Sequence, residues 1–267
     1  MKININWRKT LLVTLDVLLA VYLVMAFTSW NEPDRSGDVC TKVVVNIADD
    51  NVNGFLNSAE IKSLLERRHL YPLAWKMKDV NPRQIEQALM RMPFVRTAQC
   101  YTTVDGHVCI TITQRTPIVR VKSDNGDDYY IDDNGGVMPN SQYTSDMMIV
   151  TGRVSRHYAC TYLYLLAQQL MSDPLWRNQI EQINMLPDMT VELVPRVGDH
   201  IVNIGRLPAA DTDAARRAAI DEYVTKQMKR LTLFYKEGLK YAGWSRYDYI
   251  NLEYANQIVC RKRDVEP

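Results

Sequence analysis

The chain has 267 residues, of which 46% are hydrophobic and 24% are charged, and its formal net charge at pH 7 is +1. This length allows one large domain or two small ones beside a membrane anchor, and the composition is that of a globular protein. A nearly neutral chain gives no electrostatic reason to expect a nucleic-acid partner. The five cysteines are an odd number without C-x-x-C spacing, which argues against a zinc site or a redox motif.

An apolar segment follows a basic stretch, residues 1–10, at the start of the sequence. Residues 11–30 are long enough to cross a bilayer as a helix, which takes roughly 20 residues. We expect Leu11 and Phe27 to lie inside the membrane and Trp30 to lie at its interface. The positive-inside rule then places residues 1–10 in the cytoplasm and the bulk of the chain on the other side.

Asp16 is the single charged residue among residues 11–27, and a carboxylate at the centre of a membrane helix costs about 2.5–3.5 kcal/mol. It lies in the first half of the segment, so it either reaches toward the interface or meets a polar group on a partner helix. A cleaved signal peptide is the alternative, with an apolar region of about 7–15 residues and an A-x-A-like exit. The run here is longer and its exit VMAFTSW is a poor one, so we predict an uncleaved anchor.

Residues 31–40 are a polar linker, and residues 41–117 contain the signals of a small mixed domain. A strand is predicted over residues 42–47. Two helices follow, and each opens with a capping box: Asn57 with Glu60, then Asn81 with Gln84. Two strands come next, over residues 94–104 and 107–115. The predicted order is strand, helix, helix, strand, strand.

The last two of these strands bring Cys100 and Cys109 near each other across a turn at Asp105 and Gly106. Apolar residues alternate along both strands. Burying both apolar sets on one side of the sheet requires a loop with an odd number of residues, or a bulge. Cys109 then points away from Cys100, and we predict that no disulfide joins them.

Five acidic residues lie between residues 124 and 133, next to two Asn-Gly pairs. An EF-hand loop needs oxygen ligands at alternate positions before a glycine at the sixth, and neither Gly126 nor Gly135 fits this pattern. The Asn-Gly pairs are hairpin turn signals that bracket a strand over residues 127–132. We expect the acids to occupy solvated turn and edge positions, with calcium binding as the minor alternative.

The four histidines form no H-E-x-x-H motif, and the chain contains no G-x-S-x-G elbow, P-loop or G-x-G-x-x-G. No pair of acids stands out for glycoside hydrolysis. We therefore predict that the protein is not an enzyme. A surface for binding partners is the function that remains for an anchored domain without catalytic groups.

A long helix is predicted from about residue 212 to residue 237, with Gly238 as its C-terminal stop. Its outer face is basic. The default interpretation is that this face is solvated. The more specific interpretation is that it contacts an acidic partner or anionic lipid. The cations of this face are Lys226, Lys229, Arg230 and Lys236.

Several short motifs along the chain are similar to those of one known protein family. The strand and helix order of residues 41–117 resembles a POTRA module. ITQRTPIV resembles the family's V-x-E-R-x-P-I/V-A, with Gln114 in place of the acid. YYIDDNGGVMP resembles Y-Y-I-D-x-x-G-x-V, and MMIVTG at residues 147–152 resembles a P-x-V-T-G strand end. In their order and spacing, these motifs are similar to the bacterial cell-division family FtsQ/DivIB, and the resemblance extends over nearly the whole chain.

The resemblance implies an α+β fold: a single transmembrane helix, a POTRA-like β-α-α-β-β domain, and a larger, mostly antiparallel β-sheet domain with flanking helices. The larger domain would cover residues 118–263, before a tail at 264–267. The implied role is a non-enzymatic bitopic scaffold of the divisome, at the septum of the bacterial inner membrane and mostly periplasmic. It would link early division proteins to septal peptidoglycan synthesis by binding small single-pass coiled-coil proteins, without a cofactor, metal or small-molecule substrate.

Two other classes stay open as alternatives. A membrane-anchored POTRA protein of secretion or envelope assembly would usually carry repeated POTRA units or a barrel, and we find one unit and no run of barrel-like strands. A cell-wall hydrolase would need convergent His, Cys, Ser or paired acids, which the sequence does not single out. Binding to small coiled-coil membrane proteins would separate the scaffold from both.

The last strand, within residues 247–263, is predicted at a sheet edge, where unpaired N–H and C=O groups accept an incoming strand. The family's last-strand pattern falls on residues 250–259, with Asn251 and Glu253 at positions where the family usually has Asp and Arg. The alternative is that Tyr254 and Ile258, on one face of this strand, pack the core. The resemblance implies partner contacts at Tyr254, Asn256, Ile258, Val259, Cys260 and Arg261.

Overall fold

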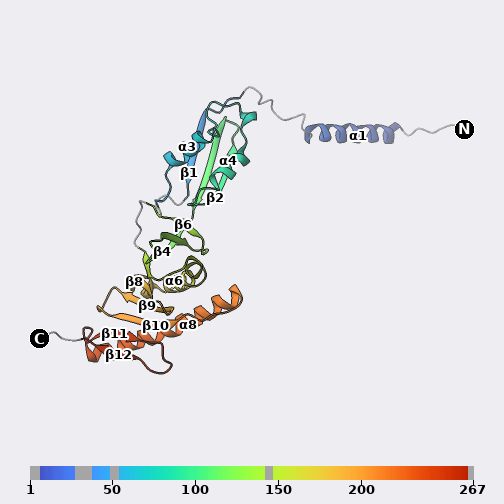
Figure 1. Ribbon diagram of the computed structural model, residues 1–267. Coiled ribbons are helices and arrows are strands. Elements are labelled where there is room, and N and C mark those ends of the chain that lie inside the picture. Colours follow the sequence, from blue (N-terminus) through green and yellow to red (C-terminus); the bar gives the residue numbers. More distant parts are fainter. Residues whose placement is uncertain (1–6, 28–37, 49–53, 142–146, 264–267) are drawn as a thin grey trace.

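The computed structural model describes residues 7–27, 38–48, 54–141 and 147–263, coloured along the chain in Figure 1. Helix α1 (Trp7–Phe27) contains the apolar segment and begins four residues before the expected position 11. Its first turn includes Arg8 and Lys9, which are good helix formers. Trp30, most of the linker and the tail at 264–267 lie outside the described residues.

The POTRA-like unit comes next along the chain and has the predicted element order, with one added short helix, η2 (Met77–Asp79). Its sheet has the order β1-β3-β2, with β1 parallel and β2 antiparallel to β3. Asn57 and Asn81 cap the two helices through Glu60 N and Gln84 N, as predicted. The main elements are β1 (Lys42–Ile47), α3 (Ser58–Arg67), α4 (Pro82–Leu89), β2 (Val95–Thr102) and β3 (His107–Gln114).

The register of β2 on β3 sets the positions of the two neighbouring cysteines. Cys100 lies opposite Ile110, and Cys109 lies opposite Tyr101. Thr102 pairs with Val108, so an odd number of residues, 103–107, separates the paired positions, as expected. Cys100 is buried in the core of the unit, whereas Cys109 is on the other, half-exposed face, and both thiols are free. The alternation of side chains across a strand therefore separates them.

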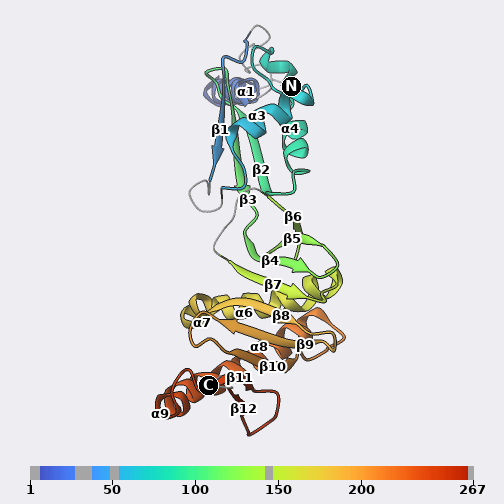
Figure 2. The ribbon, with the colours of Figure 1, turned by 60° about the vertical axis from the view of Figure 1, so that its left-hand side comes forward.

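The second unit is a mixed nine-stranded sheet with the order β12-β11-β10-β9-β8-β7-β4-β5-β6. The pairings β4–β7, β7–β8 and β10–β11 are parallel, and the others are antiparallel. Its strands succeed one another away from the POTRA-like unit, so β12 lies at the far end (Figure 2). The strands are β4 (Pro117–Ser123), β5 (Asp128–Asp132), β6 (Val137–Pro139), β7 (Met148–Gly152), β8 (Ile180–Met185), β9 (Thr190–Pro195), β10 (Ile201–Arg206), β11 (Tyr247–Asn251) and β12 (Val259–Lys262).

Helices cover one face of this sheet (Figure 2) and bury a single apolar core against it. The core joins sheet residues such as Leu193 and Ile204 to Leu166 and Leu231 from the helices. The helices are α5 (Arg156–Tyr158), η3 (Ala159–Leu163), α6 (Tyr164–Ser172), α7 (Pro174–Gln179), α8 (Asp213–Leu233), η4 (Phe234–Leu239) and α9 (Lys240–Ala242).

Gly238 does not end the long helix, contrary to the sequence prediction. The chain continues through the wider turns of η4 and the short α9, and it stops at Gly243, whose φ of 91° is the left-handed conformation of a helix C-terminus. Gly238 instead lies directly under a ring: a Cβ at this position would be 2.7 Å from Phe234 Cδ2. Close packing, not chain termination, accounts for this glycine.

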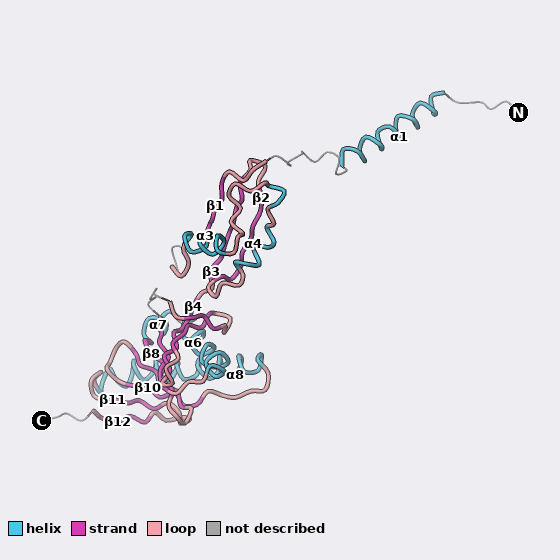
Figure 3. Tube along the Cα trace, turned by 45° about the horizontal axis from the view of Figure 1, so that its top comes forward, coloured by secondary structure: helices cyan, strands magenta, loops and turns pink. Residues whose placement is uncertain are grey.

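The two units meet where β3 runs into β4, between the two groups of strands in Figure 3. Phe55 from the POTRA-like unit packs on Tyr130, with ring centroids 5.5 Å apart. Arg115 Nε donates to Asp132 Oδ2 at 2.7 Å, and Arg96 pairs with Asp133. These contacts tie the first hairpin of the second unit to the POTRA-like unit.

The acid-rich hairpin has the predicted turns, but the expectation that its acids are merely solvated is wrong. Gly126 and Gly135 adopt φ values of 89° and 78°. Asp132, however, is only 3% exposed, and its Oδ1 accepts from the backbone N–H groups of Asn134 and Gly136. The other acids of the group that pair with arginines are Asp127, Asp128 and Asp133. The sequence could not show this, because most of these arginines lie on other strands or elements.

The predicted last strand is in fact two strands. β11 and β12 pair with each other, and residues 252–258 form a loop between them. Tyr254 and Ile258 therefore do not share a strand face, and Tyr254 is 50% exposed, so it is not a core residue. Asn256 has a φ of 62°, a left-handed conformation that a continuous strand excludes.

Candidate partner-binding site

Strand β12 is the terminal strand of the sheet, as the sequence predicts. Among the described residues it has one neighbour, β11, so one of its two edges is open. Arg263 N donates to Arg246 O on the inner side. Because consecutive peptide groups point to opposite sides of a strand, those of Cys260 and Lys262 face outward. They offer N–H and C=O groups to an incoming strand.

The side chains of β12 alternate between two environments. Cys260 packs against the core beneath the sheet, and burial raises the pKa of its thiol, which keeps the thiol neutral. Arg261 lies on the opposite face, where its guanidinium covers the ring of Tyr249 at 5.3 Å and donates to Asp248 Oδ1 at 2.9 Å. Val259 is about half exposed. One face of the strand therefore packs against the core, and the other face is exposed.

Arg230 on α8 holds the loop 252–258 in place. Its guanidinium donates to the carbonyl oxygens of Leu252 at 2.6 Å, Tyr254 at 2.8 Å and Gln257 at 2.6 Å. Three backbone acceptors on one planar group define the loop geometry, because the guanidinium fork is rigid. Arg230, predicted to belong to an outer basic face, is therefore mainly a loop clamp.

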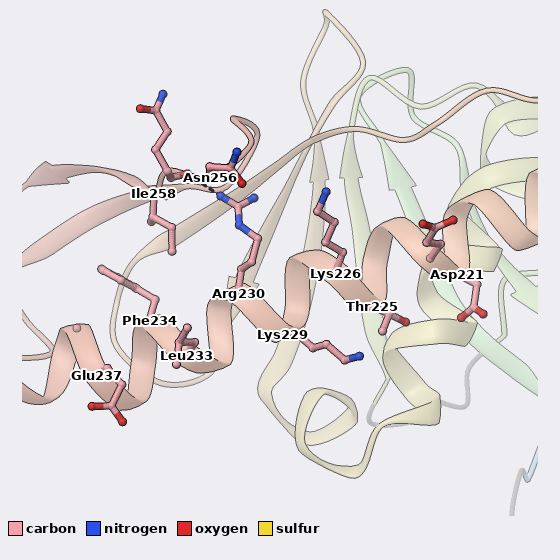
Figure 4. Close-up of a pocket in the computed structure, with 13 residues that line it drawn as sticks. Asp221, Thr225, Lys226, Lys229, Arg230, Leu233, Phe234, Glu237, Asn256 and Ile258 are labelled. Atoms are coloured by element: carbon pink, nitrogen blue, oxygen red, sulfur yellow. Dashed lines mark hydrogen bonds between the residues drawn. The ribbon is translucent and has the colours of Figure 1, made fainter.

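A groove of about 1050 Å³ runs between α8 and this loop, as the close-up in Figure 4 shows. Its apolar part consists of Leu233, Phe234 and Ile258, and the side chain of Leu233 is 63% exposed. Lys226 and Lys229 project from the middle of the lining helix segment (Figure 4) and form no ion pair with any described residue. The groove combines an apolar floor with free cations.

Acidic side chains also line the groove, but they lie toward its ends. Asp221 and Glu237 mark opposite ends of the helix segment in Figure 4. The basic side chains lie between them. The pattern suits a ligand segment that brings apolar side chains and a central negative charge.

Of the residues that the resemblance implied as partner contacts, Val259, Cys260 and Arg261 belong to β12, while Asn256 and Ile258 line the groove. Tyr254 lies earlier in the loop 252–258. The structure adds Leu233 and Phe234, which we had not singled out. The exposed leucine of an otherwise amphipathic helix was the available signal, but only the fold shows that it lies beside the loop.

The described residues contain no group of three or more His, Cys, Asp or Glu side chains placed to hold a metal ion. His200, the buried histidine, is bound to Gly198 O and Tyr235 Oη at 2.8 and 2.7 Å, away from any acid pair. The geometry that stands out is a surface for protein contacts: an open strand edge continued by a groove.

The fold is that of a protein with an apolar N-terminal helix, a POTRA-like unit and a larger mixed-sheet unit. Residues 38–113 match the model of the POTRA-like domain, and residues 116–261 match the model described as FtsQ/DivIB, C-terminal related. The second match covers more than half of the chain, and the chain belongs to the FtsQ/DivIB family. No curated protein matched the chain.

Both matched domains are non-catalytic scaffold domains, and the family acts in bacterial cell division through protein–protein contacts. Helix α1 contains a segment, Trp7–Ala26, that is long and apolar enough to cross a membrane. These features are consistent with a single-pass membrane protein of the division machinery.

Proposed function

We propose that the protein is a bitopic scaffold of the divisome at the septum, with its N-terminus in the cytoplasm and both outer units in the periplasm. It links early division proteins to the septal peptidoglycan synthesis machinery by binding small single-pass coiled-coil division proteins. The family match and the apolar helix support this role. We also propose the boundaries 41–117 and 118–263 for the two outer domains.

The open edge of β12 is the observation that carries the proposal. A partner strand placed beside β12 would bond to the outward peptide groups of Cys260 and Lys262. The neighbouring groove starts at residues 256–258, directly before β12. One partner segment can therefore pair with the strand and place an adjoining apolar, acidic stretch over Leu233, Lys226 and Lys229.

We assign the partner contacts in this complex to Tyr254, Asn256, Ile258, Val259, Cys260 and Arg261, with Cys260 contributing its backbone groups because its side chain packs against the core. The backbone contributes the affinity, and the side chains of the other residues contribute the selection of a partner. Arg261, Lys262 and Arg263 form a basic rim that increases the association rate of acidic segments. We therefore expect the association rate to fall as the salt concentration rises, since exposed charges are screened beyond about 10 Å in 0.1 M salt.

The test compares two substitutions at one position, in the full chain reconstituted in lipid nanodiscs. Lys262→Pro removes the outward N–H group and leaves the inner bond of Arg263 N untouched, whereas Lys262→Ala removes the side chain alone. Binding is measured against the outer segments of the host's small coiled-coil division proteins. We expect about tenfold weaker binding for Lys262→Pro and a change below about threefold for Lys262→Ala.

Hydrogen exchange of β11 and β12 in both variants serves as the folding control. Equal binding by Lys262→Pro and wild type, with the fold retained, would rule out strand addition at β12. No binding by wild type would move the contact to the POTRA-like unit or to α1.

A further inference from the structure

Asp16 lies within the apolar part of the membrane helix of the proposed scaffold, on which this inference rests. Helix α1 has 21 residues, and its central residue is Val17, directly after Asp16. At 1.5 Å per residue the helix is about 31 Å long, close to the ~30 Å of a bilayer core. Asp16 follows Lys9, the last basic residue before the apolar segment, by seven residues or about 10 Å of helix, so its short side chain lies within the apolar segment and not at the interface.

Helix α1 itself supplies no partner for this carboxylate. The residues one turn before and after it are Leu12, Val13, Leu19 and Ala20, which are all apolar. The nearby hydroxyl of Thr14 donates to Leu11 O at 2.9 Å. The carboxylate of Asp16 forms no hydrogen bond and no ion pair with any described residue.

An unpaired acid inside a membrane helix is costly, because lipid does not hydrate its charge. A partner helix that supplies a cation in the same plane offsets this cost. A second copy of the chain would instead place two like carboxylates together. The side chains around Asp16 on its face are Leu12, Ala20 and Leu23, and the small Ala20 lets another helix approach closely. We call Asp16, Leu12, Ala20 and Leu23 together the Asp16 face.

We propose that the Asp16 face is a docking surface for the transmembrane helix of another protein that carries a Lys or Arg within its own apolar segment. The carboxylate and the cation form an ion pair that is shielded from lipid, and the leucines pack around it. This contact is separate from β12, so the scaffold would hold a partner on two levels, within the membrane and outside it.

The test uses the full chain in membranes of its host, with a photo-crosslinking amino acid in place of Ala20, on the Asp16 face, or of Leu18, on the opposite side of α1. We expect an adduct with a second protein from position 20 and at least tenfold less from position 18. Asp16→Leu should reduce the position 20 adduct at least tenfold. Mass spectrometry of the adduct gives the sequence of the partner's membrane helix.

Support requires more than capture: the captured helix must contain a Lys or Arg within its apolar segment, and its replacement by Asp must abolish the adduct. Asp16→Lys in this chain should then restore it. The proposal is overturned by an adduct of two copies of this chain, by a captured helix without a basic residue, by an adduct that survives Asp16→Leu, or by no adduct.

A failure of the Asp16 face to bind a partner helix can be distinguished from a failure of the proposed function. Asp16→Leu chains in nanodiscs should still bind the outer partner segments with wild-type affinity, because β12 is unchanged. Recovery of the wild-type chain outside the membrane fraction would overturn the membrane span itself, and the docking surface with it.

Discussion

At the scale of single residues, His200 shows how burial selects a protonation state. The side chain is 4% exposed and lies between Gly198 O and Tyr235 Oη. A carbonyl oxygen only accepts, so the neutral ring carries its proton on Nδ1 and accepts from the tyrosine hydroxyl at Nε2. Burial lowers the pKa of His200 most, and Arg263 adds to this, while the bond to Gly198 O and the charge of Asp199 oppose it.

This lowered pKa predicts a pH dependence of stability. The folded state favours the neutral ring, so the contribution of His200 is fully present above the unfolded pKa of about 6.5 and is lost as pH falls below it. We expect the free energy of unfolding to fall between pH 7 and pH 5, and His200→Gln to flatten that fall. Urea unfolding of the full chain in detergent, followed by near-UV circular dichroism, measures both slopes.

His157 provides the matched control, because it is exposed at the start of α5. His157→Gln should keep the wild-type slope. Parallel pH profiles for wild type and His200→Gln would show that other groups cause the fall.

At the scale of elements, α8 has two roles on two faces. Ile220, Val224 and Leu231 are buried against the sheet. On the outer side, Arg230 reaches over to the loop 252–258 and Leu233 lines the groove. The helix therefore sets the position of the loop that leads into β12, and with it the shape of the proposed binding surface.

We predict that Arg230→Ala loosens this loop without unfolding the sheet. Three carbonyl oxygens lose a charged donor, and each such bond contributes about 1.5–3 kcal/mol at most. Amide exchange should accelerate at least tenfold within residues 252–258 and stay unchanged in β9 and β10. Partner binding should weaken about tenfold. Arg230→Lys tests the geometry, because it keeps the charge but not the planar fork; full rescue by lysine would argue against the clamp.

At the scale of the whole molecule, the first hairpin of the second unit fixes this unit to the POTRA-like unit. We call this contact the joint. Asp132 accepts from Arg115 and from two backbone N–H groups, and Arg115 Nη1 also donates to Pro93 O and Val137 O. Phe55 and Tyr130 pack beside this network. Its donors come from both units, so the joint couples their positions.

We predict that Asp132→Ala destabilises the chain by about 2–4 kcal/mol, since it leaves a partly buried guanidinium and two N–H groups without their acceptor. Asp124→Ala is the control, because Asp124 is exposed in the turn between β4 and β5. This substitution should change the free energy of unfolding by no more than about 0.5 kcal/mol. Urea unfolding measures both. A cost below about 1 kcal/mol for Asp132→Ala would show that the aromatic contacts hold the joint alone.

Local sequence signals predicted much of this fold, and for a physical reason. The caps at Asn57 and Asn81 depend on residues three positions away, so they are visible in the sequence. The same is true of the Asn-Gly turns and of the separate faces of Cys100 and Cys109. The terminal position of the last strand followed from the resemblance and from its place in the chain.

The predictions that failed in the second unit depend on contacts between residues far apart in the sequence or packed across a helix turn. Gly238 looked like a helix stop because glycine commonly is one, yet the ring of Phe234 beneath it decides its role. Residues 247–263 were predicted as one strand, but residues 252–258 form a loop that divides it. Arg230, far away in the sequence, fixes the break between β11 and β12.

By itself, the sequence determined the apolar helix, the order of strands and helices, the helix caps and the tight turns, because these depend on neighbours within a few residues. Only the tertiary structure decided that Asp132 is a buried joint, that Arg230 is a clamp and that an open strand edge continues into a groove. These features arise from side chains brought together by strand order and helix packing, and no local pattern encodes their distances.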